Sequence, residues 1–378
     1  MHILIAPNAF KNSLTATEAA AAIAQGLHQS KLDCTTECFP IADGGDGTGS
    51  LIMEKCNGIL VDVKVNDPLG RKIFAGYGLI DDGKTAIIEM SNASGLRLLK
   101  ADELNPMQTS SHGTGEMIKH ALDKGVSKII LAMGGSATVD GGCGILNALG
   151  IQFLNANSEL LPATPASLAD MAVIDTSQLD TRILDCEIVV ICDVDNRLLG
   201  QQGTATVFGP QKGATHLNVD QLEAFLARFN EITLQQTGKD MSKLKYGGAA
   251  GGSTAGIHAW LNAKLVNGIA YFLELTGFHQ SLQNANLVIT GEGSIDEQTL
   301  QGKGPFGVAN LAKQQNIPVI GVAGKVPVEE NAELNKYFDV LFAIGNEPTD
   351  LATAMKQTKE NLVRTGLQIG NMLCLKHD

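Results

Sequence analysis

Short apolar segments that run into glycine-rich bends, and from there into helical patterns, recur along this chain. Three such bends lie at residues 42–48, 134–144 and 290–303. A buried strand that turns tightly into a helix is the repeating unit of parallel α/β sheets, and such bends form the sheet edge where ligands bind. The recurrence therefore predicts an α/β protein whose functional residues lie in loops that follow strands.

The order of the strand and helix signals predicts two domains. Strand–helix alternation occupies both ends of the chain, whereas residues 59–90 alternate with a period of two, as antiparallel hairpins do. A chain of 378 residues also exceeds one ordinary hydrophobic core. We therefore expect a doubly wound, mainly parallel Rossmann-like domain interrupted by an inserted α+β domain, with the active site in the cleft between them. The expected ranges are 1–58, 123–152 and 285–378 for the Rossmann-like domain and 59–122 and 153–284 for the inserted domain.

Charge and composition narrow the class of partner and the compartment. The formal net charge of −12 argues against nucleic-acid binding, which needs a basic face. The seven cysteines are scattered and form no Cys-x-x-Cys pair, which fits reduced thiols. The N-terminal segment has the pattern of a first strand rather than a signal peptide, and no apolar stretch approaches the roughly 20 residues that span a bilayer. These features predict a cytoplasmic protein with no nucleic-acid or membrane partner.

The composition of the three bends favours a phosphate site. Glycines let backbone N–H groups approach an anion, and a following helix adds favourable partial charge. Carboxylates beside such a loop repel phosphate unless a divalent cation lies between them. Tight turns with aspartate caps explain one such loop, whereas three in one chain favour a nucleotide with Mg²⁺. The predicted nucleotide-binding residues are Gly44, Gly45, Gly134, Gly135, Ser136, Gly291, Gly293 and Lys303, and the predicted metal ligands are Asp43 and Asp193.

A lysine and several aspartates are candidates for the chemistry. Lys212 stands between Pro210 and Gly213, where a fixed ammonium group would neutralise phosphoryl oxygens, although loop lysines are usually solvated. Asp193 and Asp195 follow an apolar strand pattern, so either would accept a hydroxyl proton, hold a metal or cap a helix. We favour Asp193 over Asp195. The predicted catalytic residues are Asp193, Lys212 and Asp296.

The loop after the first strand supplies further polar groups. Lys11 lies within Asn8–Ser13, at the same predicted sheet edge. Its flexible point charge suits a carboxylate or a phosphate. The predicted substrate-binding residues are Lys11, Asn8, Ser13 and Asp43.

Taken together, the loops resemble the type 1 glycerate kinase family, the bacterial glycerate 2-kinases. The matching segments follow the family order along nearly the whole chain; they are residues 6–11, 42–48, 134–138, 207–214, 247–252 and 290–296. The resemblance implies in-line, ATP-dependent phosphorylation of D-glycerate with Mg²⁺, giving 2-phosphoglycerate as in the bacterial members. It also implies a role in glyoxylate and glycerate metabolism, with glycerate and ATP as partners. A homodimer is left open.

The chain departs from the family pattern at four positions. They are Asn8 where Asp is usual, Asp46 where Glu is common, Val139 where Asn is usual and Ser294 where Arg is usual. Asn8 removes a charge, which leaves Asp193, Asp43 and Asp296 as candidates for the essential carboxylates. Ser294 removes an anion clamp, which leaves the lysines at 11, 212 and 303 for that function.

Two alternative functions remain open from the sequence. A dinucleotide-dependent oxidoreductase needs Gly-x-Gly-x-x-Gly directly after the first strand, and residues 7–14 lack it. A non-catalytic protein that senses a sugar acid or a nucleotide would bind its ligand without releasing ADP. An ADP-release assay therefore separates all three functions.

Overall fold

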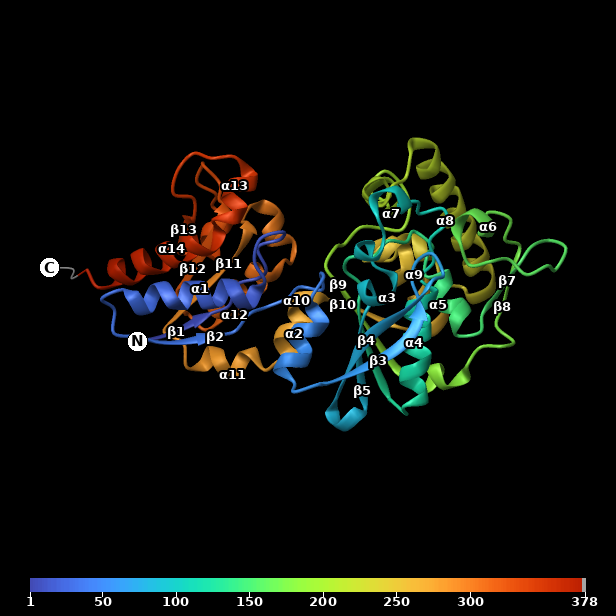
Figure 1. The fold of residues 1–378 in the computed structure, drawn as a ribbon, viewed down its shortest axis with the longest axis horizontal. Helices are drawn as coiled ribbons and strands as arrows, with labels where there is room; N and C mark the ends of the chain where they lie inside the picture. The colour runs from blue at the N-terminus through green and yellow to red at the C-terminus, as the bar shows by residue number, and fades with distance from the viewer. Residues whose placement is uncertain (376–378) are drawn as a thin grey trace. The chain divides into compact units, whose positions relative to one another are not determined.

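A computed structural model describes residues 1–375, and the chain divides into two compact units (Figure 1). Unit 1 combines Met1–Asp43 with the chain from Gly268 onward, and unit 2 is Gly44–Asn267. The chain therefore starts in unit 1, builds the whole of unit 2 and returns to complete unit 1. The predicted organisation, in which one domain is interrupted by another, has this same discontinuous form.

Unit 1 is built on a five-stranded sheet in the order β13-β12-β11-β1-β2, and all neighbouring strands are parallel. The strands are β1 (His2–Ile5), β2 (Thr35–Cys38), β11 (Leu287–Ser294), β12 (Val319–Lys325) and β13 (Val340–Ala343). From β1 the chain proceeds to β2 on one side, whereas β11, β12 and β13 succeed one another on the other side. The strand order therefore reverses between β1 and β11, and this is the position at which open α/β sheets bind ligands.

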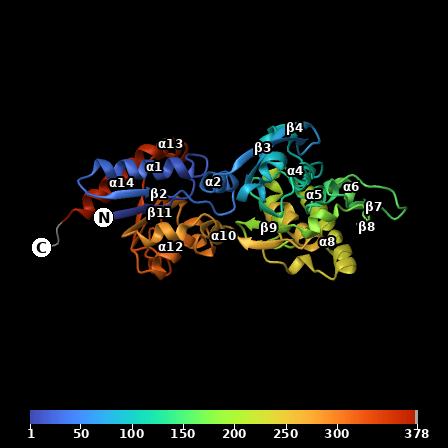
Figure 2. The ribbon, with the colours of Figure 1, turned by 90° about the horizontal axis from the view of Figure 1, so that it is seen from below.

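Helices cover both faces of this sheet, as a doubly wound fold requires (Figure 2). Figure 2 shows α1 and α14 on one side of the sheet and α12 on the other. Thr15 and Glu18 form a capping box that begins α1, as the sequence predicts. The helices of unit 1 are α1 (Ala16–Gln29), α10 (Gly268–Leu275), α11 (Phe278–Gln283), α12 (Gly304–Gln314), α13 (Leu351–Lys356) and α14 (Thr358–Leu373).

Two glycines allow α1 and α14 to approach closely. A Cβ atom added at Gly26 would overlap the backbone of Val363, and one added at Gly366 would lie 2.5 Å from the Ile23 carbonyl oxygen. Gly26→Ala is therefore expected to force the helices apart and to lower the free energy of unfolding by roughly 1–3 kcal/mol. Thermal and urea unfolding test this. Gln25→Ala, on the exposed side of α1, is the matched control and should unfold like the wild type.

Unit 2 contains a mixed six-stranded sheet in the order β10-β9-β6-β5-β4-β3. The strands β5, β6, β9 and β10 are parallel, whereas β4 is antiparallel to both β3 and β5. The strands are β3 (Ile59–Asn66), β4 (Lys72–Ile80), β5 (Thr85–Glu89), β6 (Lys128–Ala132), β9 (Glu187–Cys192) and β10 (Lys264–Asn267), with a separate antiparallel pair β7 (Gln152–Leu154) and β8 (Val173–Asp175). Loops that follow β5, β6 and β9 therefore emerge at one edge.

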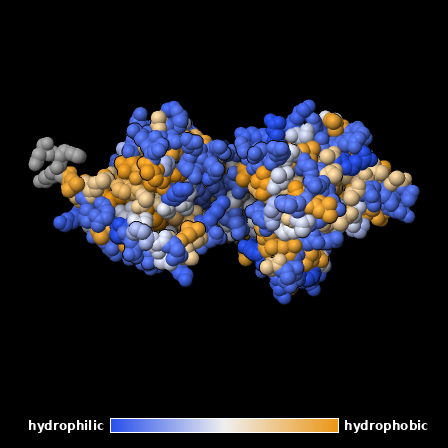
Figure 3. Space-filling model, turned by 90° about the horizontal axis from the view of Figure 1, so that it is seen from above, coloured by the Kyte–Doolittle hydropathy of each residue, from blue (hydrophilic) through white to orange (hydrophobic). Residues whose placement is uncertain are grey.

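The helices of unit 2 pack on this sheet, and all of them except α2 contribute to one large apolar core that also contains residues of β5, β6 and β9. They are α2 (Thr48–Lys55), α3 (Ser91–Ser94), α4 (His112–Asp123), α5 (Cys143–Ala148), α6 (Pro165–Leu168), α7 (Thr204–Phe208), α8 (His216–Thr237) and α9 (Ser253–Leu261). Across residues 1–375, no helix has the length and apolarity needed to cross a bilayer. On the face shown in Figure 3, polar and apolar side chains are interspersed.

The α/β class with mainly parallel sheets is confirmed, but the compact units differ from the predicted ranges. Residues 44–58 and 123–152 belong to unit 2, and residues 268–284 belong to unit 1. The physical reason is strand pairing, because β6 pairs with β5 and β9 rather than with the N-terminal strand. A buried apolar run looks the same in either sheet, so its pattern cannot show which sheet it joins.

Candidate functional site

Unit 2 contains a small cavity, about 120 Å³ in volume, at the carboxyl edge of its parallel strands. Loops after β6 and β9 and the short helical turn around Lys212 line it. Five predicted site residues meet in this cavity: Gly134, Gly135, Ser136, Asp193 and Lys212. Residues that are up to 78 positions apart in sequence are thus brought to one place, as Gly134 and Lys212 illustrate.

Lys212 is a buried cation in this cavity, with only 3% of its surface exposed. Its Nζ donates hydrogen bonds to Ser136 Oγ at 2.8 Å and to the Thr138 carbonyl oxygen at 2.7 Å. Burial lowers the pKa of Lys212 to about 7, and the Asp140 carboxylate opposes this effect. Both of these acceptors are neutral, and a phosphate oxygen would add a charge-assisted partner for the ammonium group.

The predicted loop at residues 42–48 packs against the loop that follows β6. Gly44 adopts φ +104°, and a Cβ there would lie 3.2 Å from the Asp193 backbone nitrogen. A Cβ at Gly134 would overlap the backbone of Gly45 and Asp46. Only glycine permits such close backbone approach. The two predicted glycine loops of unit 2 therefore form one continuous surface.

A fully buried carboxylate organises the loop after β6. Asp140 accepts hydrogen bonds from the backbone N–H and the hydroxyl of Ser111, at 2.8 and 2.7 Å. It also accepts from the N–H groups of Gly142 and Gly144, both at 3.1 Å. Its charge favours the ammonium form of Lys212. Asp140 therefore positions the loop and balances the buried lysine.

Unit 1 holds a second cluster at its switch point, in the loops that follow β1, β2 and β11. Asn8 is buried, and its Nδ2 donates to Asp43 Oδ2 at 2.8 Å. The same oxygen receives the N–H of Gly304, at the start of α12, at 3.4 Å. At position 8 an amide therefore donates to Asp43, whereas an aspartate would repel it.

Glu292 is the central carboxylate of the unit 1 cluster. It is 9% exposed, and its Oε1 accepts from Thr299 Oγ1 at 3.1 Å. Burial raises the pKa of Glu292 to about 7, Lys303 and Lys11 lower it, and Asp43 raises it. The electrostatic coupling of these groups indicates that the two predicted lysines and Asp43 act on one small region of unit 1.

The remaining predicted residues have other surroundings. Ser13 Oγ donates to the Met355 carbonyl oxygen at 2.5 Å. Asp296 caps a short helical turn by accepting from the Gln298 N–H at 2.9 Å, and Ser294 Oγ donates to it at 3.3 Å. Asp296 also lines an open cavity of about 630 Å³ in unit 1, together with three further carboxylates.

The predicted glycine bend near residue 291 is wrong in one respect, because β11 continues through it to Ser294. Gly291 pairs with Val322 of β12, and a Cβ at Gly291 would overlap the carbonyl oxygen of Val322. Gly291 therefore serves close strand packing, whereas Gly293 is open to solvent. The strand therefore extends through the first five residues of the predicted bend, 290–294.

A match to a family model over nearly the whole chain decides which family the chain belongs to. The glycerate kinase family model covers residues 3–374. The chain belongs to the glycerate kinase family. It is 43% identical to the glycerate kinase of Haemophilus influenzae, with 100% of each chain covered. It is 39% identical to the glycerate 2-kinase of Escherichia coli K12, with 99% of this chain and 98% of the relative covered.

A solved structure agrees. The crystal structure from Salmonella typhimurium LT2 that is assigned as glycerate kinase 2 matches with a TM-score of 0.83 and 42% identity, covering 99% of this chain and 98% of that one. The resemblance to the glycerate kinase family is thereby confirmed, and so is the phosphotransferase class of enzyme. For this member of the glycerate kinase family, the individual residue roles remain predictions.

Sequence reasoning missed two carboxylates, Asp140 and Glu292. Both stand inside glycine-rich motifs, Asp140-Gly141-Gly142 and Gly291-Glu292-Gly293. A carboxylate directly followed by glycine, in a loop or strand end after an apolar run, was the available signal. Nothing in the sequence shows that Asp140 is fully buried or that Glu292 lies close to Thr299.

The residues present fit a metal that arrives with the nucleotide better than a preformed metal site. Within residues 1–375, no group of three or more His, Cys, Asp or Glu side chains could hold a metal ion. Mg²⁺ usually binds proteins through one or two carboxylates, with phosphates and water completing its shell. Of the two predicted ligands, Asp43 belongs to unit 1 and Asp193 to unit 2. Each unit therefore contains one predicted carboxylate ligand.

The raised pKa of Glu292 predicts how stability depends on pH. Between pH 4.5 and about 7 the folded chain binds a proton at Glu292 that the unfolded chain has lost. This carboxyl therefore makes folding less favourable as pH rises through that window, by roughly 3 kcal/mol in total. Glu292→Gln should have a larger free energy of unfolding than the wild type at pH 8. At pH 5 this advantage should be smaller. Urea unfolding in metal-free buffer tests this, and an equal effect at both pH values would contradict it.

Proposed function

We propose that this member of the glycerate kinase family transfers the γ-phosphoryl group of ATP to the 2-hydroxyl of D-glycerate, in the cytoplasm and with Mg²⁺. The observation that carries the proposal is the buried ammonium of Lys212 within a glycine-loop cavity that also contains Asp193. Phosphoryl transfer depends mainly on positioning and on neutralising charge, and this cavity offers both. The name of the Escherichia coli relative supports the 2-position.

The nucleotide phosphates are proposed to bind to unit 2. The backbone N–H groups of the loops at 45–47 and 134–136 would donate to phosphate oxygens. Lys212 would neutralise the transferring group, and Asp193 would orient or deprotonate the glycerate hydroxyl. Lys303, which precedes α12, is proposed as a further phosphate ligand from unit 1.

The glycerate carboxylate is proposed to bind to the cluster of unit 1. Lys11 is exposed and carries a point charge that suits a carboxylate. Asn8 and Asp43 would hold the glycerate hydroxyls by hydrogen bonds, and Asp43 would also serve Mg²⁺. When bound, Mg²⁺ would neutralise charge on the phosphate oxygens. We also propose a homodimer, which a measurement of mass in solution tests.

The test is ADP release with a panel of hydroxy acids. D-Glycerate is expected to release ADP with saturation kinetics, while L-glycerate, lactate and tartrate release far less. An enzyme that oxidises glycerate with a nicotinamide dinucleotide, and releases no ADP from ATP, would be an oxidoreductase. Binding of glycerate or ATP without turnover would instead support a sensing protein. Either of these last results would overturn the proposal.

A further inference from the structure

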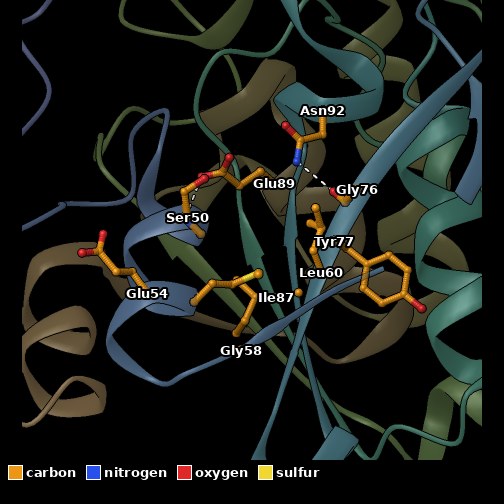
Figure 4. A pocket seen from close by; sticks show the side chains of 12 residues that line it. Ser50, Glu54, Gly58, Leu60, Gly76, Tyr77, Ile87, Glu89 and Asn92 are labelled. Atoms are coloured by element: carbon orange, nitrogen blue, oxygen red, sulfur yellow. Dashed lines mark hydrogen bonds between the residues drawn. The ribbon is translucent and has the colours of Figure 1, made fainter. Parts of the chain in front are cut away.

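A second cavity in unit 2, about 290 Å³ in volume, has no role in the proposed reaction so far (Figure 4). It lies between α2 and the strands β3, β4 and β5. Its volume is at the lower end of the roughly 300 to 1,000 Å³ of small-molecule sites. Four of its lining residues are glycines, Gly49, Gly58, Gly76 and Gly78. The Met53 side chain packs directly on Gly78, where an added Cβ would overlap its sulfur.

The lining of this cavity suits an uncharged, flat group. Met53, Leu60 and Ile87 provide apolar surface, and Figure 4 shows the Tyr77 ring pointing away from Glu89 and Ser50. Among the described residues that line the cavity, none is lysine or arginine, and the charged ones are Glu54 and Glu89. A phosphate would be repelled here. A heterocycle whose N–H groups donate to carboxylate oxygens would be favoured.

The cavity neighbours the loops that carry the predicted phosphate-binding glycines. Glu89 ends β5 and accepts the N–H of Gly49 at 2.6 Å and also that of Ser50, at the start of α2. This helix follows the loop at 44–47 directly. Ser91 Oγ donates to Asp46 Oδ1 at 2.8 Å, and a Cβ at Gly135 would lie 3.1 Å from Ser91 Cβ. Glu89 thus lines the cavity and holds the start of the helix that follows one glycine loop, and Ser91, two residues later, contacts both glycine loops.

We infer that this cavity receives the purine base of the nucleoside triphosphate whose phosphates lie on the loop at 134–136. The inference rests on the proposed function, since it completes the same nucleotide site. The exocyclic amine of adenine would donate to a carboxylate oxygen of the lining, and its ring would lie on the apolar wall. The larger cavity of unit 1 suits the base less well, because its lining contains four carboxylates.

The test is to fill the cavity by substituting larger side chains for residues at its rim. Leu60 is 61% exposed, so Leu60→Trp should leave folding intact. Gly76→Leu is a second filling variant, because its Cβ would lie 2.9 Å from Cδ1 of the exposed Leu60 side chain, which can rotate away. Both variants are expected to raise KM for ATP at least tenfold, with KM for D-glycerate and kcat within twofold of wild type. Phe74→Trp is the matched control, since Phe74 is 77% exposed on the same hairpin and outside the lining.

The outcomes separate the cavity from the reaction. If both filling variants keep the wild-type KM for ATP, or raise only the KM for glycerate, the inference is overturned. If the wild type releases no ADP, the proposed function fails by itself. Titration calorimetry of MgADP with the wild type and both variants then tests the cavity independently. Weaker MgADP binding in both filling variants than in the wild type supports the inference. Unchanged MgADP binding overturns it.

Discussion

Lys212→Ala is expected to lower turnover by roughly a hundredfold or more, the range seen when a charge-stabilising donor is removed. The ammonium of Lys212 is buried and is fixed by Ser136 and Thr138, so its charge acts in a medium where water screens little. Such a group costs no reorganisation when charge develops on the phosphoryl oxygens. Steady-state ADP release, with ATP and glycerate both saturating, measures the loss. Turnover near the wild-type value would refute the role.

The Lys212 experiment needs a variant that keeps the fold. Since burial lowers the pKa of Lys212 to about 7, the unfolded chain binds the extra proton between pH 7 and 10.5. The buried ammonium therefore costs stability at neutral and lower pH, and that cost disappears as pH rises through this window. Lys212→Met fills similar space without the charge. It is expected to lose turnover like the alanine variant while unfolding at pH 6 no earlier than the wild type.

Asp193→Asn is expected to lower turnover by roughly 10² to 10⁴, the usual contribution of a positioned general base. Asp193 directly follows β9 and lines the cavity that contains Lys212. The amide keeps the shape of the side chain but can neither accept a proton from the glycerate hydroxyl nor hold a metal as a carboxylate does. Single-turnover kinetics, which separate chemistry from product release, provide the measurement.

The neighbouring aspartate is the matched control for this prediction. Asp195 is exposed, two residues further along the same loop, and does not line the cavity. Asp195→Asn should retain turnover within a few-fold of the wild type. Equal losses in the two variants would show that the loop, rather than the Asp193 carboxylate, is what the reaction requires.

Five of the candidate residues that line the cavity of unit 2 could be named from the sequence because each stands in a short local pattern. Gly134, Ser136 and Asp193 follow buried strands directly, and parallel strands bring their carboxyl ends to one edge. Lys212 was recognisable from its rigid glycine and proline neighbours. These residues stand in short segments whose patterns are strong. Their convergence depends on the pairing of β6 with β9, whereas the predicted ranges placed these strands in different domains.

The parts that sequence could not predict depend on contacts between distant segments. The burial of Asp140 arises because residues 111 and 142–144 surround it, and no local pattern records that. β6 joins the second sheet through pairing with β5 and β9, although its apolar pattern fits either sheet. Where a run of apolar residues continues into Gly291, the strand extends beyond the expected turn because β12 pairs with it.

Phosphoryl transfer to glycerate is tested most directly by ³¹P NMR of the reaction. Purified protein is incubated with ATP, Mg²⁺ and D-glycerate while ³¹P NMR spectra are recorded. If the 2-hydroxyl is phosphorylated, the γ-phosphate resonance of ATP is lost and a phosphomonoester doublet appears. The doublet arises because the phosphorus couples to the single proton at C2 of glycerate. A triplet would mean that the 3-hydroxyl is phosphorylated, and no phosphomonoester at all would contradict the central claim that the protein phosphorylates glycerate.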